Sequence, residues 1–214
     1  ARNNMTRLQA LQQDSTANND SIDYRLFTSR EPVLDMLNTK YYLYGDYAEE
    51  NPYALGNAWF VSRIRYVATP NEEMQALSSL NPADEAVADE TFRHILGETR
   101  PKAPGDTVTL TSYAPDRLKY RTRSTAGGVA VFSEVYFPWG WQVTLDGQPV
   151  EMGRADYTLR ALQVPAGEHE VEFYFNPKSL SVTNTIGAVA VAVIFILCAA
   201  ALAVRVLRLR NKRM

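Results

Sequence analysis

The stretch IGAVAVAVIFILCAAALAV, residues 186–204, runs for nineteen residues without a charge. At about 1.5 Å of rise per residue, a helix of this length just covers the roughly 30 Å hydrocarbon core of a bilayer. A helix packed on one side of a soluble core would be amphipathic, whereas this stretch is apolar all round. The sequence therefore predicts a transmembrane helix at residues 184–206.

Two alternative interpretations fit this stretch less well. A fully buried helix in a soluble protein would need more surrounding chain than the mixed residues before it supply. A bacterial wall-sorting tail would need an LPxTG-type cleavage signal, which the preceding PKSLSVTNT lacks. A permanent anchor is the interpretation that we favour.

The charges on either side of the helix predict its orientation. All 24 acidic residues precede it, and an excess of cations next to a span marks the cytoplasmic side. We therefore expect residues 1–185 to be extracytoplasmic, residues 207–214 to form a basic cytoplasmic tail, and the protein to lie in a bacterial cytoplasmic membrane. The orienting cations are Arg205, Arg208, Arg210, Lys212 and Arg213.

Composition narrows the class of protein further. The acidic outer part gives no support to nucleic-acid binding. The single cysteine, Cys198, lies inside the span, so the outer part uses no disulfide, which fits a bacterial envelope protein. The chain begins at Ala1 without a signal peptide, and we expect it to be the C-terminal part of a longer multispan protein.

Residues 1–104 predict a mixed α+β extracytoplasmic region. Capping residues and apolar spacing favour short helices, tyrosine-rich and β-branched runs favour strands, and the Gly- and Pro-rich segment 94–106 marks a boundary. Asn71 is the expected cap of the third helix. The expected helices are 4–14, 31–37 and 71–77, with a further helical turn at 83–90, ADEAVADE. A strand is expected to begin at 23–27, and further strands are expected at 41–44 and 58–67.

Residues 105–178 alternate polar and apolar side chains with period two, which predicts an antiparallel β-sandwich. Residues 129–137 are apolar on both faces and are expected to form a central strand, whereas Asp146-Gly147 predicts a hairpin turn. The expected strands are 107–113, 117–123, 129–137, 141–145, 154–163 and 169–175. The predicted fold is α+β: a mixed N-terminal part, then the sandwich, then one transmembrane helix.

This back half resembles a known family. The segment VFSEVYFPWGWQVTLDGQPVEMGRADYTLRALQVPAGEHEVEFYFNP, followed by a membrane helix, is similar to the C-terminal region of the YfhO family of bacterial multispan membrane proteins. The ordered series SE-x-Y-x-P-x-G-W, DG, AdYxLRA and PAGxHxVxFxF carries the resemblance, and LDMLNTKYYL and NPYALGNAWFV add to it. Trp139 departs from the family pattern, in which Pro is often followed directly by Gly-Trp.

The resemblance implies a parent protein similar to the GT-C class of integral-membrane glycosyltransferases. Such enzymes use polyprenyl-phosphate-linked sugars, and YfhO-like proteins are associated with glycosylating envelope polymers such as teichoic acids. Their catalytic carboxylates lie in loops near the first spans, so no catalytic residue is carried over to this chain. The implied role of this segment is accessory or acceptor-recognising, without a cofactor of its own, and its implied partners are the bilayer, the remaining spans and an envelope glycopolymer.

A second hypothesis belongs to another class of protein. The chain could be a free-standing, membrane-anchored carbohydrate-binding or assembly module without enzyme activity. An enzyme within the segment itself would need clustered acid and base residues, and the sequence shows none. His94 and His169 lack neighbouring ligands and predict no metal site.

Three aromatic residues next to a Pro-Gly turn are candidate carbohydrate contacts: Tyr136, Trp139 and Trp141. Aromatic rings commonly pack on the apolar faces of sugars. The alternative is structural, with Trp141 in the sandwich core and Trp139 bracing the turn.

Four cations on one strand face are candidate contacts for an anionic ligand: Arg117, Lys119, Arg121 and Arg123. They could contact phosphates of a lipid-linked sugar, a polymer or a headgroup. Alternatively they protect an exposed sheet edge. Asp156, Arg160 and Glu134 are a further group, for which a structural salt link between Asp156 and Arg160 is the favoured interpretation.

Overall fold

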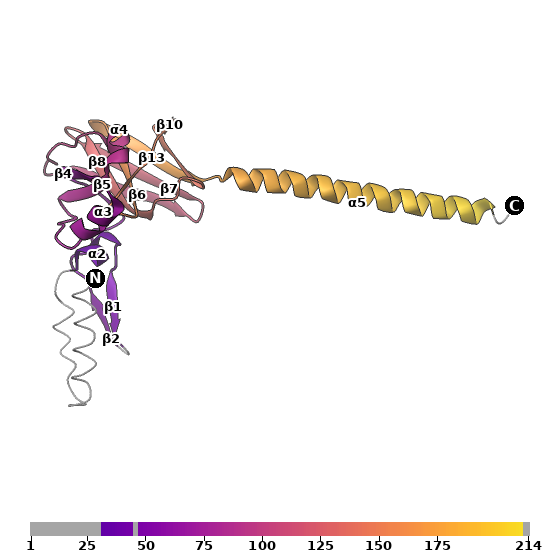
Figure 1. Cartoon of the computed structure of the whole chain (residues 1–214), viewed down its shortest axis with the longest axis horizontal. Coiled ribbons are helices and arrows are strands. Elements are labelled where there is room, and N and C mark those ends of the chain that lie inside the picture. The colour runs from indigo at the N-terminus through magenta and orange to yellow at the C-terminus, as the bar shows by residue number, and fades with distance from the viewer. Residues whose placement is uncertain (1–30, 45–46, 212–214) are drawn as a thin grey trace, which may run out of the picture.

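The computed structural model describes residues 31–44 and 47–211 of the chain. The helix expected at 4–14 and the strand start expected at 23–27 lie outside the described residues. Within the described part, a β-rich domain is followed by one long helix, α5 (Lys178–Asn211), which projects away from the domain (Figure 1). The fold is α+β with mostly antiparallel sheets, as the sequence predicts.

Five antiparallel strands form the larger sheet. Their order is β10 (Gln148–Val150), β9 (Trp141–Leu145), β13 (Gly167–Phe175), β7 (Arg117–Ser124) and β6 (Thr107–Ala114). Asp146 and Gly147 turn the chain between β9 and β10 with φ of 51° and 77°, which confirms the predicted hairpin. On β7, Leu118, Tyr120 and Thr122 are buried, as the period-two pattern predicts.

Four strands form the second sheet, in the order β11 (Gly153–Ala155), β12 (Leu159–Val164), β8 (Gly128–Val135) and β3 (Ala58–Phe60). The two sheets pack face to face around an apolar cluster. Three rings lie at its centre. The centroid of the Phe132 ring lies 4.9 Å from those of Tyr120 and Phe173, and both contacts are edge-on. The predicted sandwich is therefore present.

Strand β8 has an apolar core on each side. Val129 and Val131 join the cluster on the outer side of the sheet, whereas Ala130 and Phe132 join the cluster between the sheets. β8 also lies between β12 and β3 within its sheet. The prediction of a central strand here is confirmed, because a strand buried on both faces has an apolar residue at every position.

A third layer covers the outer face of the four-stranded sheet. It contains the parallel strands β4 (Arg63–Val67) and β5 (Glu85–Asp89), joined through α3 (Pro70–Ala76) and followed by η2 (Glu90–Phe92) and α4 (Arg93–Leu96). These elements enclose a second core. Its larger buried members are Met36, Trp59, Val61, Leu77, Leu80, Val87, Leu96, Val129, Val131 and Leu159.

Three local predictions in the front half were wrong. The helical turn expected at 83–90 is β5, because Ala86, Val87 and Ala88 are fully buried and pair with β4, which outweighs the helical propensity of alanine. The strand expected at 58–67 is two strands in different sheets. The cap of α3 is Thr69, which forms a reciprocal capping box with Glu72, and not Asn71.

The front residues include a helix and a hairpin that precede the sandwich. They are α2 (Pro32–Met36), β1 (Tyr41–Tyr44) and β2 (Tyr47–Glu50), and the helix and first strand agree with the sequence. Asn51 donates to the buried Asp35 carboxylate over 3.0 Å. Because β3 pairs with β8, the expected regions 1–104 and 105–178 share one sheet and one core.

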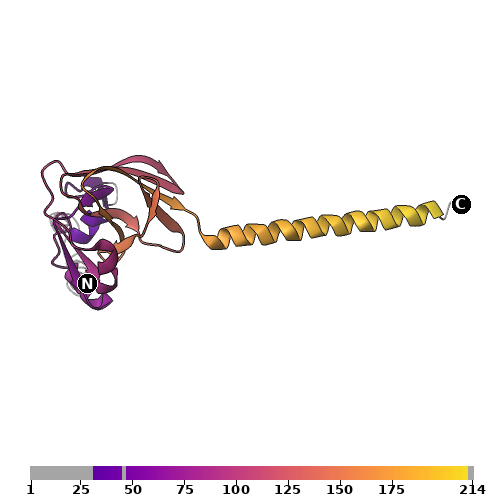
Figure 2. The same ribbon diagram turned by 90° about the horizontal axis from the view of Figure 1, so that it is seen from above.

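Helix α5 leaves the end of the sandwich and extends clear of it in both views (Figures 1 and 2). Residues Val182–Arg205 are long and apolar enough to cross a membrane, and none of their apolar window is buried in the described structure. The helix is therefore a candidate membrane span, and its apolar surface lacks a protein partner within the described residues.

Candidate functional site

The loop between β8 and β9 presents aromatic side chains at one end of the sandwich. A tight turn forms it, since the backbone N–H groups of Gly140 and Trp141 both donate to the Phe137 carbonyl, over 3.3 and 3.0 Å. Trp139 lies at the tip and is 77% exposed, which is unusual for the largest apolar side chain. Its ring contacts that of Phe137 edge-on, with centroids 5.4 Å apart.

Phe175, at the end of β13, extends this aromatic surface. Its ring lies 5.4 Å from that of Trp141, and Gly140 lies between it and Phe137. A Cβ on Gly140 would clash with the Phe175 ring and come within 3.0 Å of Phe137 Cδ1. We name the four residues Phe137, Trp139, Trp141 and Phe175 the aromatic rim.

The aromatic rim is fastened to the chain just before α5. The Asn176 N–H donates to the Gly140 carbonyl over 2.8 Å, and Gln142 Nε2 donates to the Asn176 carbonyl over 3.3 Å. On the other side, the Phe175 N–H donates to the Asp116 carbonyl over 2.8 Å. Since α5 begins at Lys178, the rim lies beside the start of the candidate span.

The three predicted carbohydrate contacts are placed differently. Trp139 is exposed, but Tyr136 is half-buried against Phe92, with ring centroids 5.5 Å apart. Trp141 is half-buried, packs on the sandwich core and lies 4.2 Å beneath the Arg160 guanidinium. Their role as carbohydrate contacts stays a prediction. Sequence reasoning missed Phe137 and Phe175; the signal for Phe175 was its position at the end of the last strand, three residues before α5.

Arg160 is a buried cation beneath the loop. It is 2% exposed, its Nε donates to the Val135 carbonyl over 3.0 Å, and its guanidinium also lies 5.1 Å from the Phe173 ring centroid. Burial lowers the pKa of Arg160, while nearby Glu134 acts in the opposite direction. Burial also disfavours the charged form of Glu134, and for a carboxyl group this raises the pKa. The cation therefore braces Trp141 from inside the domain and is not available to a ligand.

Asp156 does not pair with Arg160, so the predicted salt link between them is wrong. The expected strand 154–163 is interrupted after β11, where Asp156 and Tyr157 adopt φ of 51° and 69°, and this turn directs the two side chains apart. Asp156 is fully buried against β5. Burial raises the pKa of its carboxyl group to about 7, and the Coulomb effects of Glu73 and Glu85 act in the same direction.

Glu73, on α3, is the second buried acid at this junction. Its Oε2 accepts from Arg154 over 2.8 Å, and its Oε1 accepts from the Tyr157 N–H over 2.8 Å. The side chain is completely buried, and burial raises the pKa of its carboxyl group. These contacts join the third layer to the β11–β12 turn, so we assign this acid cluster a structural role.

The cationic row on β7 faces a row of glutamates on β13. Arg117 forms an ion pair with Glu172, Lys119 lies 3.3 and 3.5 Å from Glu172 and Glu170, and Arg123 lies 3.8 Å from Glu168. β7 lies between β13 and β6, so the alternative of edge protection is wrong. Arg121 makes no ion pair with the described residues. We name the four cations of β7 together with these glutamates the charge ladder.

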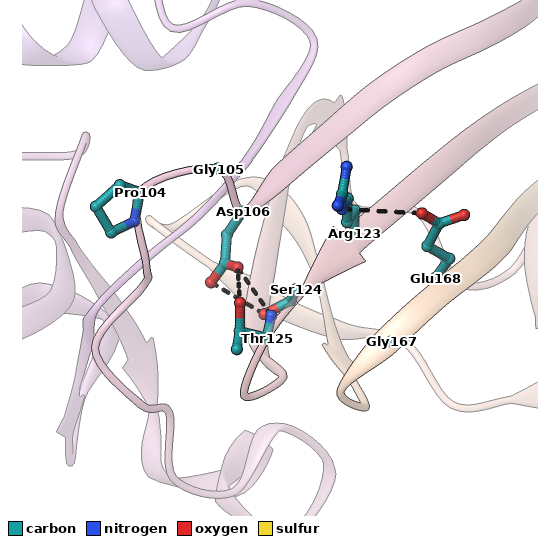
Figure 3. Close-up of a pocket in the computed structure, with 8 residues that line it drawn as sticks. All are labelled: Pro104, Gly105, Asp106, Arg123, Ser124, Thr125, Gly167 and Glu168. Carbon is teal, nitrogen blue, oxygen red and sulfur yellow. Dashed lines mark hydrogen bonds and ion pairs between the residues drawn. The ribbon is translucent and has the colours of Figure 1, made fainter.

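A shallow hollow of about 340 Å³ lies at one end of this ladder (Figure 3). Asp106 organises it by accepting hydrogen bonds from the Ala103 and Thr125 N–H groups, both over 2.9 Å, and from the Ser124 hydroxyl over 3.0 Å. Although partial burial opposes them, these hydrogen bonds lower the pKa of Asp106. The carboxylate therefore joins its own loop to the end of β7 and has a bracing role.

The orienting cations lie at the far end of α5. Arg205 and Arg208 are exposed, Arg210 belongs to the helix, and Lys212 and Arg213 lie outside the described residues. Across residues 31–44 and 47–211, no group of three or more His, Cys, Asp or Glu side chains could hold a metal ion.

Comparisons with protein-family models, with curated proteins and with solved structures found no match to this chain.

Proposed function

We propose that this chain is the extracytoplasmic C-terminal portion and last membrane span of a YfhO-like integral-membrane glycosyltransferase. The observation that carries the proposal is α5, whose 24-residue candidate span has no part of its apolar window buried. Such a surface needs an apolar partner, and lipid together with further spans would provide it. In this proposal the domain faces outward and the basic end of the helix faces the cytoplasm.

The role proposed for the domain itself is non-catalytic. Its most perturbed acids, Asp156 and Glu73, are completely buried and bind the protein's own backbone and Arg154, so they cannot reach a substrate. The parent enzyme would take its sugar from a polyprenyl-phosphate donor and transfer it to an envelope glycopolymer. The domain would cover the outer side of the active-site cavity and contact the acceptor through exposed side chains such as Arg121.

Topology is the first test of the proposal. Met74, on α3, is 48% exposed, and Asn211 is exposed at the last turn of α5. In a Cys198→Ala background, a cysteine at position 74 should react with a membrane-impermeant maleimide added outside cells that express the chain in its natural reading frame. A cysteine at position 211 should react only after the membrane is opened. The reverse labelling pattern would overturn the orientation.

Acceptor contact is the second test. The full chain in nanodiscs should retain a teichoic-acid-type polymer at low salt, and neutralising Arg117, Lys119 and Arg121 to glutamine should weaken this retention. A matched control neutralises three cations of the third layer that are exposed: Arg63, Arg65 and Arg93. Equal retention by all three proteins would remove the charge ladder from acceptor recognition.

A free-standing anchored binding or assembly module is the second candidate. The observation that favours it is that, among residues 31–44 and 47–211, both apolar cores consist of residues of the domain alone. The two candidates differ in what the natural reading frame encodes before Ala1. A multispan region with sugar transfer from a polyprenyl-phosphate donor supports the first, and a lone export signal supports the second.

A further inference from the structure

The exposed members of the aromatic rim form a surface that the domain does not cover. Phe137, Trp139 and Phe175 are 43%, 77% and 41% exposed. Tyr113, 69% exposed near the end of β6, lies at the same end of the five-stranded sheet, because Ala114 pairs with Arg117 and Arg117 with Tyr174. Four exposed rings therefore lie at the end of the sandwich from which α5 leaves.

The length of α5 places this surface at a defined height above a bilayer. Its 34 residues extend about 51 Å, which exceeds the roughly 40–45 Å of a bilayer with its headgroups. The candidate span of 24 residues extends about 36 Å and so exceeds the hydrocarbon core by roughly 6 Å, an excess that tilting accommodates.

Chain connectivity fixes the distance from the rim to the lipid. Asn176, which binds Gly140 through its backbone, precedes α5 by two residues and Val182 by six. Two extended residues and four helical ones separate Asn176 from Val182 by at most about 13 Å. The backbone that carries the rim therefore lies within about 13 Å of the first residue of the candidate span.

We propose that the aromatic rim is an interfacial membrane contact, in which Trp139 inserts between the lipid headgroups of the outer leaflet and fixes the domain's orientation on the bilayer. Trp and Tyr favour this layer because one part of the ring system is apolar and another binds water. The inference rests on the proposed span of α5. It is favoured over a sugar site at the rim because the nearby polar groups of Gln142 are already bound to Asn176 and Tyr174.

The test uses the full chain in zwitterionic nanodiscs and tryptophan emission. Subtracting the spectrum of Trp139→Phe from that of the wild type isolates the emission of Trp139. Lipids that carry a spin label near the headgroup should remove most of this difference emission, and aqueous iodide should quench it weakly. Two reporters are built in the Trp139→Phe background: Met74→Trp on the exposed surface of α3, and Phe195→Trp, whose parent side chain is 71% exposed within the span. Because position 195 lies near the middle of the span, this second reporter is measured with lipids that carry the spin label at the end of an acyl chain.

The two reporters separate the possible outcomes. If Phe195→Trp is quenched by the acyl-chain label and Trp139 is quenched by the headgroup label, the inference holds. If Phe195→Trp is quenched but Trp139 is quenched only by iodide, as Met74→Trp is expected to be, the rim is not a membrane contact although the span is. If the emission of Trp139 changes when glycopolymer is added and labelled lipid does not quench it, the rim is a sugar-binding surface and not a membrane contact. An unquenched Phe195→Trp would overturn the span and the inference together.

Discussion

Two hydrogen bonds join Asp156 and Val87, and each residue donates one of them. The Asp156 N–H donates to the Val87 carbonyl over 2.7 Å, and the Val87 N–H donates to Asp156 Oδ1 over 2.9 Å. The pair joins the β11–β12 turn to β5 and thereby joins the sandwich to the third layer. Oδ2 of the same carboxyl group is buried without a hydrogen-bond partner, so the protein buries this group more readily when it is protonated.

The first prediction concerns the pH dependence of stability. The folded pKa of Asp156, about 7, lies above that of an unfolded aspartate, so the folded chain binds the proton more tightly. The carboxyl group therefore contributes most to the free energy of unfolding below about pH 4. This contribution, on the order of 4 kcal/mol, is lost as the pH rises to about 7. Asp156→Asn should flatten this decline, since asparagine keeps an oxygen acceptor and tolerates positive φ.

Denaturant unfolding in detergent between pH 4 and pH 8, followed by tryptophan fluorescence, measures this slope. Asp106→Asn serves as a control, because the pKa of that carboxyl group is lowered and its loss should not remove the decline. An unchanged slope in Asp156→Asn would show that the carboxyl group is ionised in the folded protein throughout this range.

The second prediction concerns Glu73. Replacing it with alanine leaves Arg154 and the Tyr157 N–H without their acceptor and should lower the free energy of unfolding by about 3 kcal/mol. Met74→Ala, at the exposed neighbouring position on the same helix, should change it by less than about 0.5 kcal/mol. Equal effects of the two substitutions in thermal or denaturant unfolding would contradict the structural role of Glu73.

The sandwich could be predicted from sequence because its strands alternate strictly and its turns contain the residues that the turns require. β7 shows the pattern most clearly, and β8 is recognisable because both of its faces are apolar. The candidate span could be predicted because a long apolar stretch without charges is typical of a membrane helix. In each case the information is local, so the pattern within a single element is enough to indicate the structure.

The parts of the fold and of the candidate site that could not be predicted depend on contacts between segments far apart in the sequence. β5 has a composition that favours helix and becomes a strand only because β4 and Asp156 supply its hydrogen-bond partners. The charge ladder could not be predicted, since the neighbour of β7 is β13, which lies about 50 residues further along the chain. The aromatic rim was only partly predicted, because Phe175 joins it through its register with Trp141.

The third prediction concerns His169. Its Nδ1 lies 2.6 Å from Asp146 Oδ2 and its Nε2 lies 3.2 Å from the Ala166 carbonyl, so the imidazolium can donate to both. The hydrogen bond to Asp146 raises the pKa of His169. Its stabilising contribution is therefore fully present below about pH 6.5 and is lost as the pH rises through the higher folded pKa.

His169→Gln should remove this part of the pH dependence and lower the melting temperature at about pH 5.5 more than at about pH 8.5. Nuclear magnetic resonance titration of the imidazole provides a direct check of the raised pKa. Combining His169→Gln with Asp156→Asn should give the flattest stability profile of the set, and a pKa of His169 at or below about 6.5 would exclude its contribution.

The last prediction concerns the packing of the aromatic rim. Gly140→Ala introduces a methyl group where the Phe175 ring lies, and overpacking of this kind typically costs about 1–3 kcal/mol. Phe175→Leu removes the ring and should relieve the clash, so the double variant should be more stable than the sum of the two single losses predicts. The cycle is measured by denaturant unfolding in detergent. If Gly140 is required only for the turn, the losses will add, because removing the ring would then leave the cost of the methyl group unchanged. A positive coupling would instead show that the loop carrying Trp139 is held in place by a ring that lies three residues before α5, which is the fixed arrangement that an interfacial anchor requires.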